Sequence, residues 1–163
     1  MTPFQRQFTS QLLDELKTIL SNPGKLNDAN QAYTKGNKDI RYQTNTDITK
    51  CSQWSANQIE LFNSALFQAL ERTSTSLSSR NPYTPYANEE LIKEINNATN
   101  QFRARVIPKI TEHVDTANPL ASVVNNITNI KSEYAATSPY TFFSIAAAGI
   151  IIAAGVAAAQ LKN

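Results

Sequence analysis

One short stretch of the sequence carries residue types that acid–base chemistry needs. His113 directly follows Glu112 and lies two residues before Asp115. A histidine near carboxylates can exchange protons close to neutral pH. On a helix, however, side chains that are adjacent in sequence point in different directions. The chain has no second histidine and no nucleophile motif around a serine or cysteine. We therefore expect a solvated helix end at this position and no catalytic residue.

The other candidates for chemistry are a lone thiol and a group of carboxylates. Cys51 is the single cysteine, so it forms no internal disulfide and, with one histidine in the chain, no zinc site. Near Trp54 it is expected to pack as a small apolar residue. Glu89, Glu90 and Glu94 suit the first turns of a helix, where the dipole favours negative charge. The sequence thus predicts a non-enzymatic protein without metal or cofactor.

Charge and length limit the classes that remain. Fifteen Lys and Arg residues face thirteen Asp and Glu residues, for a net charge of +2, and no basic run is present. Nucleic-acid binding is therefore not expected. The N-terminus lacks the apolar stretch of a secretory signal, so no cleaved signal peptide is predicted. With 163 residues, the chain is predicted to form one domain, with or without an anchor.

Four segments repeat apolar residues every three or four positions, the pattern of an amphipathic helix. These segments cover about residues 3–20, 55–77, 88–114 and 119–134. Thr2 and Ser55 are expected to cap the first two helices, and Pro108 is expected to kink or split the third. The predicted fold is all-α, an up-and-down bundle of about four amphipathic helices plus a C-terminal all-apolar helix. The predicted division is 1–138 for the bundle, with a mobile polar loop near 25–50, and 139–163 for the apolar helix.

The linker between the second and third predicted helices carries two tyrosines. Tyr83 and Tyr86 lie among prolines, which keep the linker extended. An extended segment with exposed aromatic rings is a candidate partner-binding surface. The alternative is that both rings pack the linker against the bundle, and the sequence alone favours this second interpretation.

The C-terminal segment from Phe142 to Ala159 is apolar on every side and contains no charge. About 18 residues at 1.5 Å each span roughly 27 Å, close to the thickness of a bilayer core. The segment predicts a tail anchor, with the protein on a membrane and its bundle on the cytosolic side. Its partners would be a lipid bilayer and another protein, or a second copy, through the face of small residues. The residues assigned to this membrane and helix-packing role are Phe142, Phe143, Ala146, Gly149, Ile150, Ile151, Ile152, Ala153, Gly155, Val156 and Ala157.

A second interpretation of the same segment stays open. Its strong apolar residues contribute only about −2 to −4 kcal/mol to membrane insertion, because alanine and glycine fill the remainder. A helix that is apolar all round can also form the centre of a soluble bundle or an interface between copies. In that case a trigger could expose it for membrane insertion or assembly. The function predicted from the sequence is thus a membrane-attached interaction protein, or alternatively a soluble bundle that buries this helix.

Overall fold

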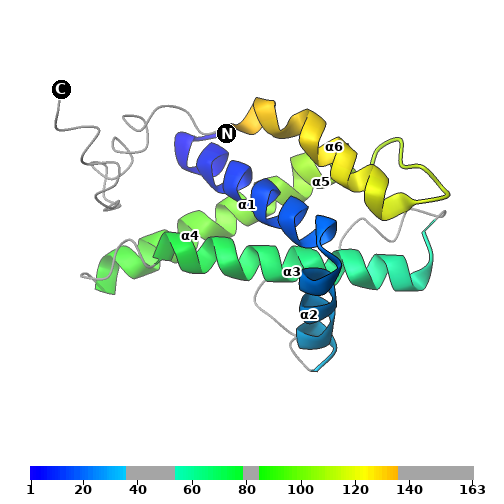
Figure 1. Ribbon diagram of the computed structural model, residues 1–163. Coiled ribbons are helices and arrows are strands. Elements are labelled where there is room, and N and C mark those ends of the chain that lie inside the picture. The colour runs from blue at the N-terminus through cyan, green and yellow to red at the C-terminus, as the bar shows by residue number, and fades with distance from the viewer. Residues whose placement is uncertain (36–53, 79–84, 136–163) are drawn as a thin grey trace, which may run out of the picture.

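The computed structural model in Figure 1 describes residues 1–35, 54–78 and 85–135 of the chain. Helices are the regular secondary structure of these residues, which contain no strand, and this confirms the all-α class predicted from the sequence. Side chains are described for the same residues except 85–88. The elements are α1 (Pro3–Ser21), α2 (Pro23–Thr34), α3 (Ala56–Ser78), α4 (Pro85–Gln101), the π-helical segment η2 (Phe102–Val106), α5 (Ile107–Ile110) and α6 (Pro119–Tyr134).

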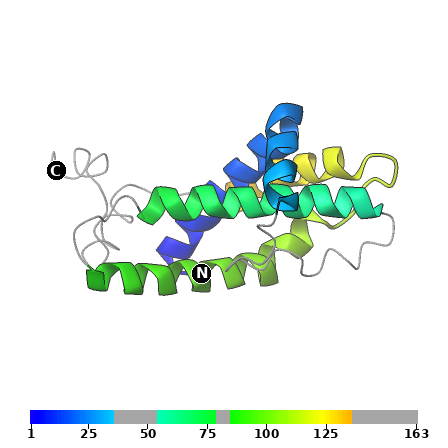
Figure 2. The ribbon, with the colours of Figure 1, turned by 90° about the horizontal axis from the view of Figure 1, so that it is seen from below.

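Helix α1 is the common wall of the bundle. It packs against α3 on one side and α6 on the other, and it also contacts α4 and α2. In Figure 1, α1 runs between α6 above and α3 below, and α2 crosses α3 at a steep angle. Figure 2 shows that α3 and α4 run side by side in opposite directions. Because α1 contacts α2, α3, α4 and α6, its side chains set how far apart these helices lie.

The core forms from the apolar faces that the sequence pattern predicts. All seven apolar residues expected on the buried face of α1 are buried, and the matching residues of α3, α4, η2 and α6 join them in one cluster. The largest fully buried side chains come mainly from α1 and α3. They are Phe4, Phe8, Phe62, Phe102, Leu12, Leu13, Leu16, Ile19, Leu66, Leu70 and Leu77.

Local side-chain hydrogen bonds fix where the helices begin. Thr2 and Gln5 form a reciprocal capping box at the start of α1, with both hydrogen bonds at 3.1 Å. Ser55 and Gln58 form the same arrangement before α3, at 3.0 and 3.1 Å. Both predicted caps are confirmed, and each satisfies two backbone donors that a bare helix end would leave unpaired.

A second helix follows α1 almost without a loop. The side chain of Asn22 accepts a hydrogen bond from the backbone N–H of Lys25 at 3.1 Å, and Pro23 occupies the first turn of α2. Ala29 and Tyr33 of α2 are buried, and the Tyr33 ring lies 5.9 Å from that of Phe67 on α3. Residues 25–34 of the polar loop predicted near 25–50 are therefore helical. Residues 36–50 lie outside the described ones.

Pro108 changes the register of its helix where the sequence predicted a kink or a split. Proline cannot donate to the carbonyl four residues earlier. The preceding turn widens into the π-helical segment η2, and the N–H of Ile107 bonds to the carbonyl of Phe102, five residues back. The chain then continues directly as α5. A π-helical turn is a common way to absorb such a disruption without breaking the helix.

The predicted membrane localisation is wrong. Within the described ranges, no helix is both long enough and apolar enough to cross a bilayer. The physical reason is amphipathicity: even α3, with 23 residues, carries Glu60, Glu71 and Arg72 on its polar side. The segment 142–159, on which the tail-anchor and transmembrane prediction depended, lies outside the described residues. So does the whole of the predicted apolar unit 139–163, and this division of the chain stays a prediction.

Candidate functional site

An open cleft with a volume of about 480 Å³ lies along α3 where it faces α1. Its lining is entirely polar and comes from five side chains of α3 and one of α1. They are Gln68, Glu71, Arg72, Thr75, Ser76 and Glu15. We call this feature the α1–α3 cleft. Since α1 and α3 pack through their apolar faces, the cleft marks the edge of the interface, where the polar sides of both helices meet.

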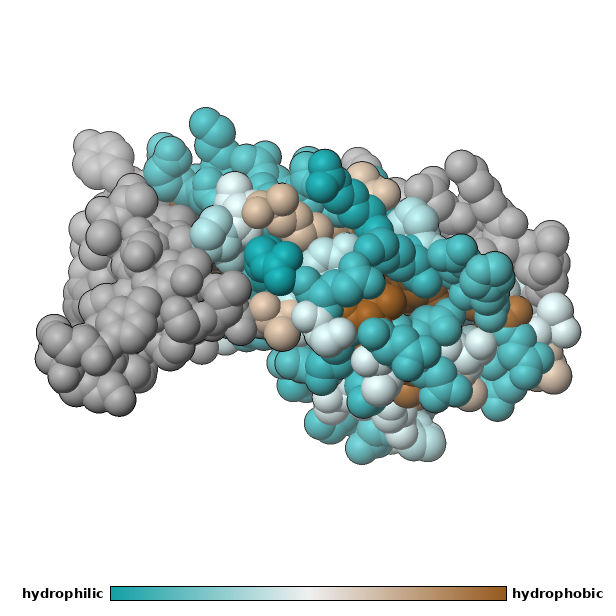
Figure 3. Space-filling model, turned by 90° about the horizontal axis from the view of Figure 1, so that it is seen from above, coloured by the Kyte–Doolittle hydropathy of each residue, from teal (hydrophilic) through white to brown (hydrophobic). Residues whose placement is uncertain are grey.

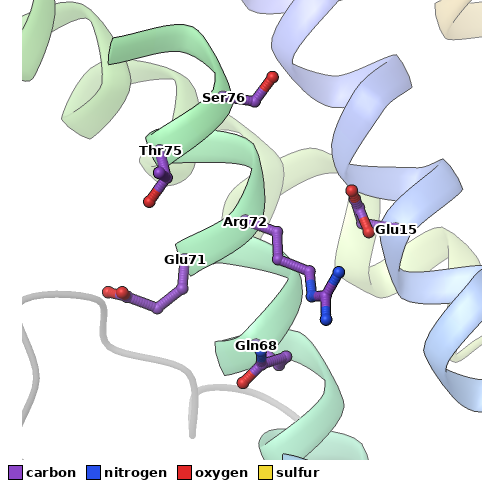
Figure 4. A pocket seen from close by; sticks show the side chains of 6 residues that line it. All are labelled: Glu15, Gln68, Glu71, Arg72, Thr75 and Ser76. Atoms are coloured by element: carbon purple, nitrogen blue, oxygen red, sulfur yellow. The ribbon is translucent and has the colours of Figure 1, made fainter. Parts of the chain in front are cut away.

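Figure 4 shows how the charged side chains of the cleft are oriented. Arg72 reaches from α3 toward α1, and Glu15 points from α1 back toward α3. Glu71 and Thr75 extend from the side of α3 that is turned away from α1. Within the described part of the chain, neither Arg72 nor Glu15 has an ion pair or a side-chain hydrogen bond, and the same holds for Gln68 and Thr75. The cleft thus presents opposite charges that are not paired with each other.

One helical turn away from Glu15 and Arg72, a direct hydrogen bond joins α1 and α3. The side-chain amide of Gln11 donates to the hydroxyl of Ser76 at 2.9 Å. Gln11 precedes Glu15 by four residues, and Ser76 follows Arg72 by four. The pair Gln11–Ser76 therefore lies one helical turn from the pair Glu15–Arg72, as expected between antiparallel helices. The oxygen of the Gln11 amide is buried and has no partner among the described residues. The hydrogen bond between Gln11 and Ser76 therefore fixes the spacing of α1 and α3 directly beside the α1–α3 cleft.

The opposite side of α1 carries a contrasting group of charges, which all have partners. Lys131 of α6 forms an ion pair with Asp14, and Lys109 of α5 pairs with Glu133 at 2.7 Å. Arg6 donates to the backbone carbonyl of Glu133 at 2.6 Å. The hydrogen bond to Glu133 is the main cause that raises the pKa of Lys109 above its usual value, with a further contribution from Tyr134. We call these contacts the α6 clamp, because they hold the last turns of α6 against α1 and α5.

His113, the sequence candidate for proton transfer, lies in the turn between α5 and α6. Its backbone adopts a left-handed conformation with φ of 54°, and its side chain is 88% exposed. Its Nε2 lies 3.1 Å from the carboxylate of the neighbouring Glu112. The turn is held from α6: Asn126 donates to the carbonyls of Ile110 and Glu112 at 3.1 and 2.8 Å. His113 is thus an exposed turn residue and not part of a helix end, because the predicted helix 88–114 already ends at Ile110. Its position lies outside the α1–α3 cleft.

Most of the remaining predicted site residues lie outside the part of the chain that the structure describes. Tyr83 lies outside the described residues, and Tyr86 belongs to α4 but its side chain is not among those described. Cys51 and all assigned residues of the apolar segment from Phe142 to Ala157 also lie outside. Among described residues, no group of three or more His, Cys, Asp or Glu side chains is placed to hold a metal ion.

The sequence analysis did not identify the α1–α3 cleft. The polar row Gln68, Arg72 and Ser76 recurs every four residues and so marks one side of α3. That row was a usable signal, but a row of polar residues on a helix usually faces water. What makes it a site is the register in which α1 brings Glu15 opposite Arg72, and no local pattern encodes that register.

The surface of the described residues favours polar contacts in general. Ile92 is the one large apolar side chain that counts as exposed among them, at 53%. In Figure 3 the visible apolar residues form a narrow stripe bordered by hydrophilic ones. Large apolar patches mark many stable interfaces, whereas a polar surface suits reversible contacts. A partner of this surface is therefore expected to be recognised by hydrogen bonds and charge.

Comparison with known proteins gives consistent matches to one family. The family model described as "Effector protein MavE" matches residues 4–139. The effector protein MavE of Legionella pneumophila subsp. pneumophila (strain Philadelphia 1) is 32% identical over 176 aligned positions, which cover this whole chain and 81% of the relative. A crystal structure of the Legionella effector protein MavE matches with a TM-score of 0.65 at 33% identity. That match covers 80% of this chain and 92% of the other.

Proposed function

The chain belongs to the MavE effector family, and on that basis we propose that it is a non-enzymatic effector that acts by binding a host protein through the α1–α3 cleft. The observation that carries this proposal is the set of polar side chains in the cleft without partners among the described residues: Glu15, Gln68, Arg72 and Thr75. Hydrogen-bonding groups on a fixed helical surface can be satisfied by a partner with little rearrangement of the protein.

The shape and chemistry of the cleft support a protein partner over a small molecule. Small-molecule sites are enclosed and mostly apolar, with a few polar groups that set the orientation. Here all six lining residues are polar and the cleft is open to solvent. The exposed position of His113, outside the cleft, supports a function without proton transfer. Binding without chemistry is therefore the function that this geometry favours.

Photo-crosslinking in host cells tests the proposal. A benzophenone amino acid at Gln68 places the reactive group in the cleft, and the same amino acid at exposed Asn125 on α6 is the matched control. We expect an adduct from position 68 that is absent from position 125 and that is lost when Arg72→Glu is added. Identical adducts from both positions, or an adduct unaffected by Arg72→Glu, would contradict the proposal.

A second candidate concerns assembly through the apolar segment 142–159. Helices α1, α3, α4 and α6 turn their apolar faces toward one another, so a core forms among the described residues. This supports an assembly role for the segment, with the small residues Ala146, Gly149, Ala153 and Ala157 as the contact face for a second copy or another protein. Gly149→Leu should then reduce self-association measured by light scattering, whereas the conservative Ile151→Leu should not. An unchanged mass for Gly149→Leu would exclude self-association through this face.

A further inference from the structure

The α1–α3 cleft contains two oppositely charged half-sites, and this determines the chemistry of what it can bind. Arg72 is exposed and offers a planar set of N–H donors, which suit a carboxylate. Glu15 is half-buried and offers two acceptor oxygens, which suit an ammonium or guanidinium group. Each half-site selects for a group of the opposite charge. The cleft as a whole therefore selects for a ligand that carries both.

The spacing of the two half-sites is set by helix geometry. Glu15 faces Arg72 from the next helix, one turn beyond the hydrogen bond between Gln11 and Ser76. The separation leaves the two charges without a direct ion pair among the described residues. A helix presents side chains four residues apart on one face, with their Cβ atoms about 5–6 Å apart. A helix that carries an acidic and a basic side chain four residues apart therefore presents both charges on one face.

We propose that the α1–α3 cleft recognises a helical segment of its partner that carries one acidic and one basic side chain a single turn apart. The acidic side chain pairs with Arg72 and the basic one with Glu15, while Gln68 supplies a further hydrogen bond. The proposal rests on the proposed function, because it names the chemistry of the partner at that site. All six lining residues carry polar side chains, so the proposal favours a charged or polar group of the partner over an apolar anchor.

Charge complementarity also predicts that the contact is reversible. Partly exposed ion pairs each contribute little to affinity and are screened by salt. Two such pairs together change an affinity about two- to thirtyfold. The partner segment should thus bind weakly by itself and more weakly as ionic strength rises. It would provide selectivity within a larger interface.

Defined peptides test this chemistry without knowledge of the natural partner. Three alanine-based helical peptides are titrated into the full-length ¹⁵N-labelled protein. They carry Glu and Lys, two Lys, or two Glu residues at positions four apart. Backbone amide shifts of Glu15, Gln68 and Arg72 report binding at the cleft. We expect the mixed peptide to bind about three- to tenfold more tightly than either like-charged peptide at low salt.

Charge variants of the protein should redirect this preference. Arg72→Glu leaves only acidic charges in the cleft and should favour the peptide with two lysines. Glu15→Lys places a second basic side chain opposite Arg72 and should favour the peptide with two glutamates. The double variant Glu15→Gln, Arg72→Gln removes both half-sites and should lose the preference for the mixed peptide. Circular dichroism confirms that each variant folds. If a charge-reversal variant does not fold, the double glutamine variant still tests the proposal, through the loss of the preference for the mixed peptide.

The outcomes separate this proposal from the proposed function. Preferences that follow the charges of the cleft support the proposal. Equal binding of all three peptides, or no shift with any of them, overturns it, even if the crosslink from position 68 identifies a specific partner. Conversely, peptide binding could follow the charges while no specific crosslink forms in host cells. That result would support the proposed ligand chemistry of the cleft and contradict the proposal that the effector binds its host partner there.

Discussion

Asp14 and Glu15 are neighbours on α1, yet their carboxylates lie in different electrostatic environments. Asp14 faces α6 and forms an ion pair with Lys131. Glu15 faces α3 and lies opposite Arg72 without an ion pair among the described residues. Both carboxylates have a cation available on the neighbouring helix. The difference comes from the way in which α6 and α3 pack against α1.

This comparison separates charge complementarity that stabilises a structure from complementarity that remains available for binding. In the α6 clamp, Lys131, Lys109 and Arg6 contact their partners directly and hold the end of α6. In the α1–α3 cleft, opposite charges of similar chemistry face each other across a gap. The identity of the residues is therefore not enough to assign a role to a charge. The local spacing of the helices decides whether a pair closes.

The largest expected effect comes from removing the apolar support that both sides of α1 share. Phe8 is fully buried, with its ring 6.5 Å from that of Phe4. Phe8→Ala should lower the free energy of unfolding by about 3–5 kcal/mol, because it removes a large buried side chain and leaves a cavity. Urea unfolding followed by circular dichroism measures this loss.

The control for Phe8→Ala is Ser10→Ala at a partly exposed position on the same helix. It should change the stability by less than about 0.5 kcal/mol. If Phe8→Ala cost no more than this control, α1 would not be the common wall of the bundle. The comparison of its two sides would then lose its basis.

The next effect concerns the α6 side alone. Asn126→Ala removes two hydrogen bonds to the carbonyls of Ile110 and Glu112. We expect a loss of about 1–3 kcal/mol, at roughly 0.5–1.5 kcal/mol for each bond. Hydrogen exchange should rise in the turn around His113 and stay unchanged along α3. Equal acceleration in α3 would show that the two sides of α1 are not independent.

Local signals in the sequence were sufficient for the helices and their core. The caps at Thr2 and Ser55, the stripe of apolar residues on α1 and the disruption at Pro108 depend on residues within one turn of each other. The structure confirms the caps and the stripe, and it refines the effect of Pro108 to a π-helical turn. Helix α2 was harder to predict, because few of its residues are apolar and its stability depends on Tyr33 packing against Phe67.

The candidate site could not be predicted in the same way. Glu15 and Arg72 are separated by 57 positions in the sequence, and their approach depends on the register between two packed helices. The sequence analysis gave most weight to the apolar segment after Phe142, because its composition gives a strong signal by itself. A site made from ordinary polar residues gives no such signal. Function at helix interfaces is for this reason less visible in a sequence than the helices themselves.

A smaller effect is expected from the ion pair at the end of α6. Glu133 raises the pKa of Lys109 in the folded protein above the ordinary value of 10.5. The stabilisation is therefore fully present below pH 10.5 and is lost as the pH rises through the folded-state pKa of Lys109. Glu133→Gln should lower the melting temperature slightly at neutral pH, by less than Asn126→Ala does. The difference from the wild type should close above pH 10.5. A difference that persisted there would assign the effect to something other than this charge pair.

The smallest and most direct test compares the two neighbouring carboxylates. Asp14→Asn breaks the pair with Lys131, which is partly exposed, and should cost about 0.2–1 kcal/mol at low salt. Glu15→Gln breaks no ion pair among the described residues and should have an effect near zero. In 1 M salt, where screening acts within about 3 Å, the two variants should become equally stable.

Double-mutant cycles with Lys131→Met and Arg72→Met measure the coupling of Asp14 with Lys131 and of Glu15 with Arg72. A coupling between Glu15 and Arg72 as large as that between Asp14 and Lys131 would mean that the α1–α3 cleft closes in solution, because only a direct pair produces it. A coupling near zero would mean that both charges of the cleft remain available to a partner.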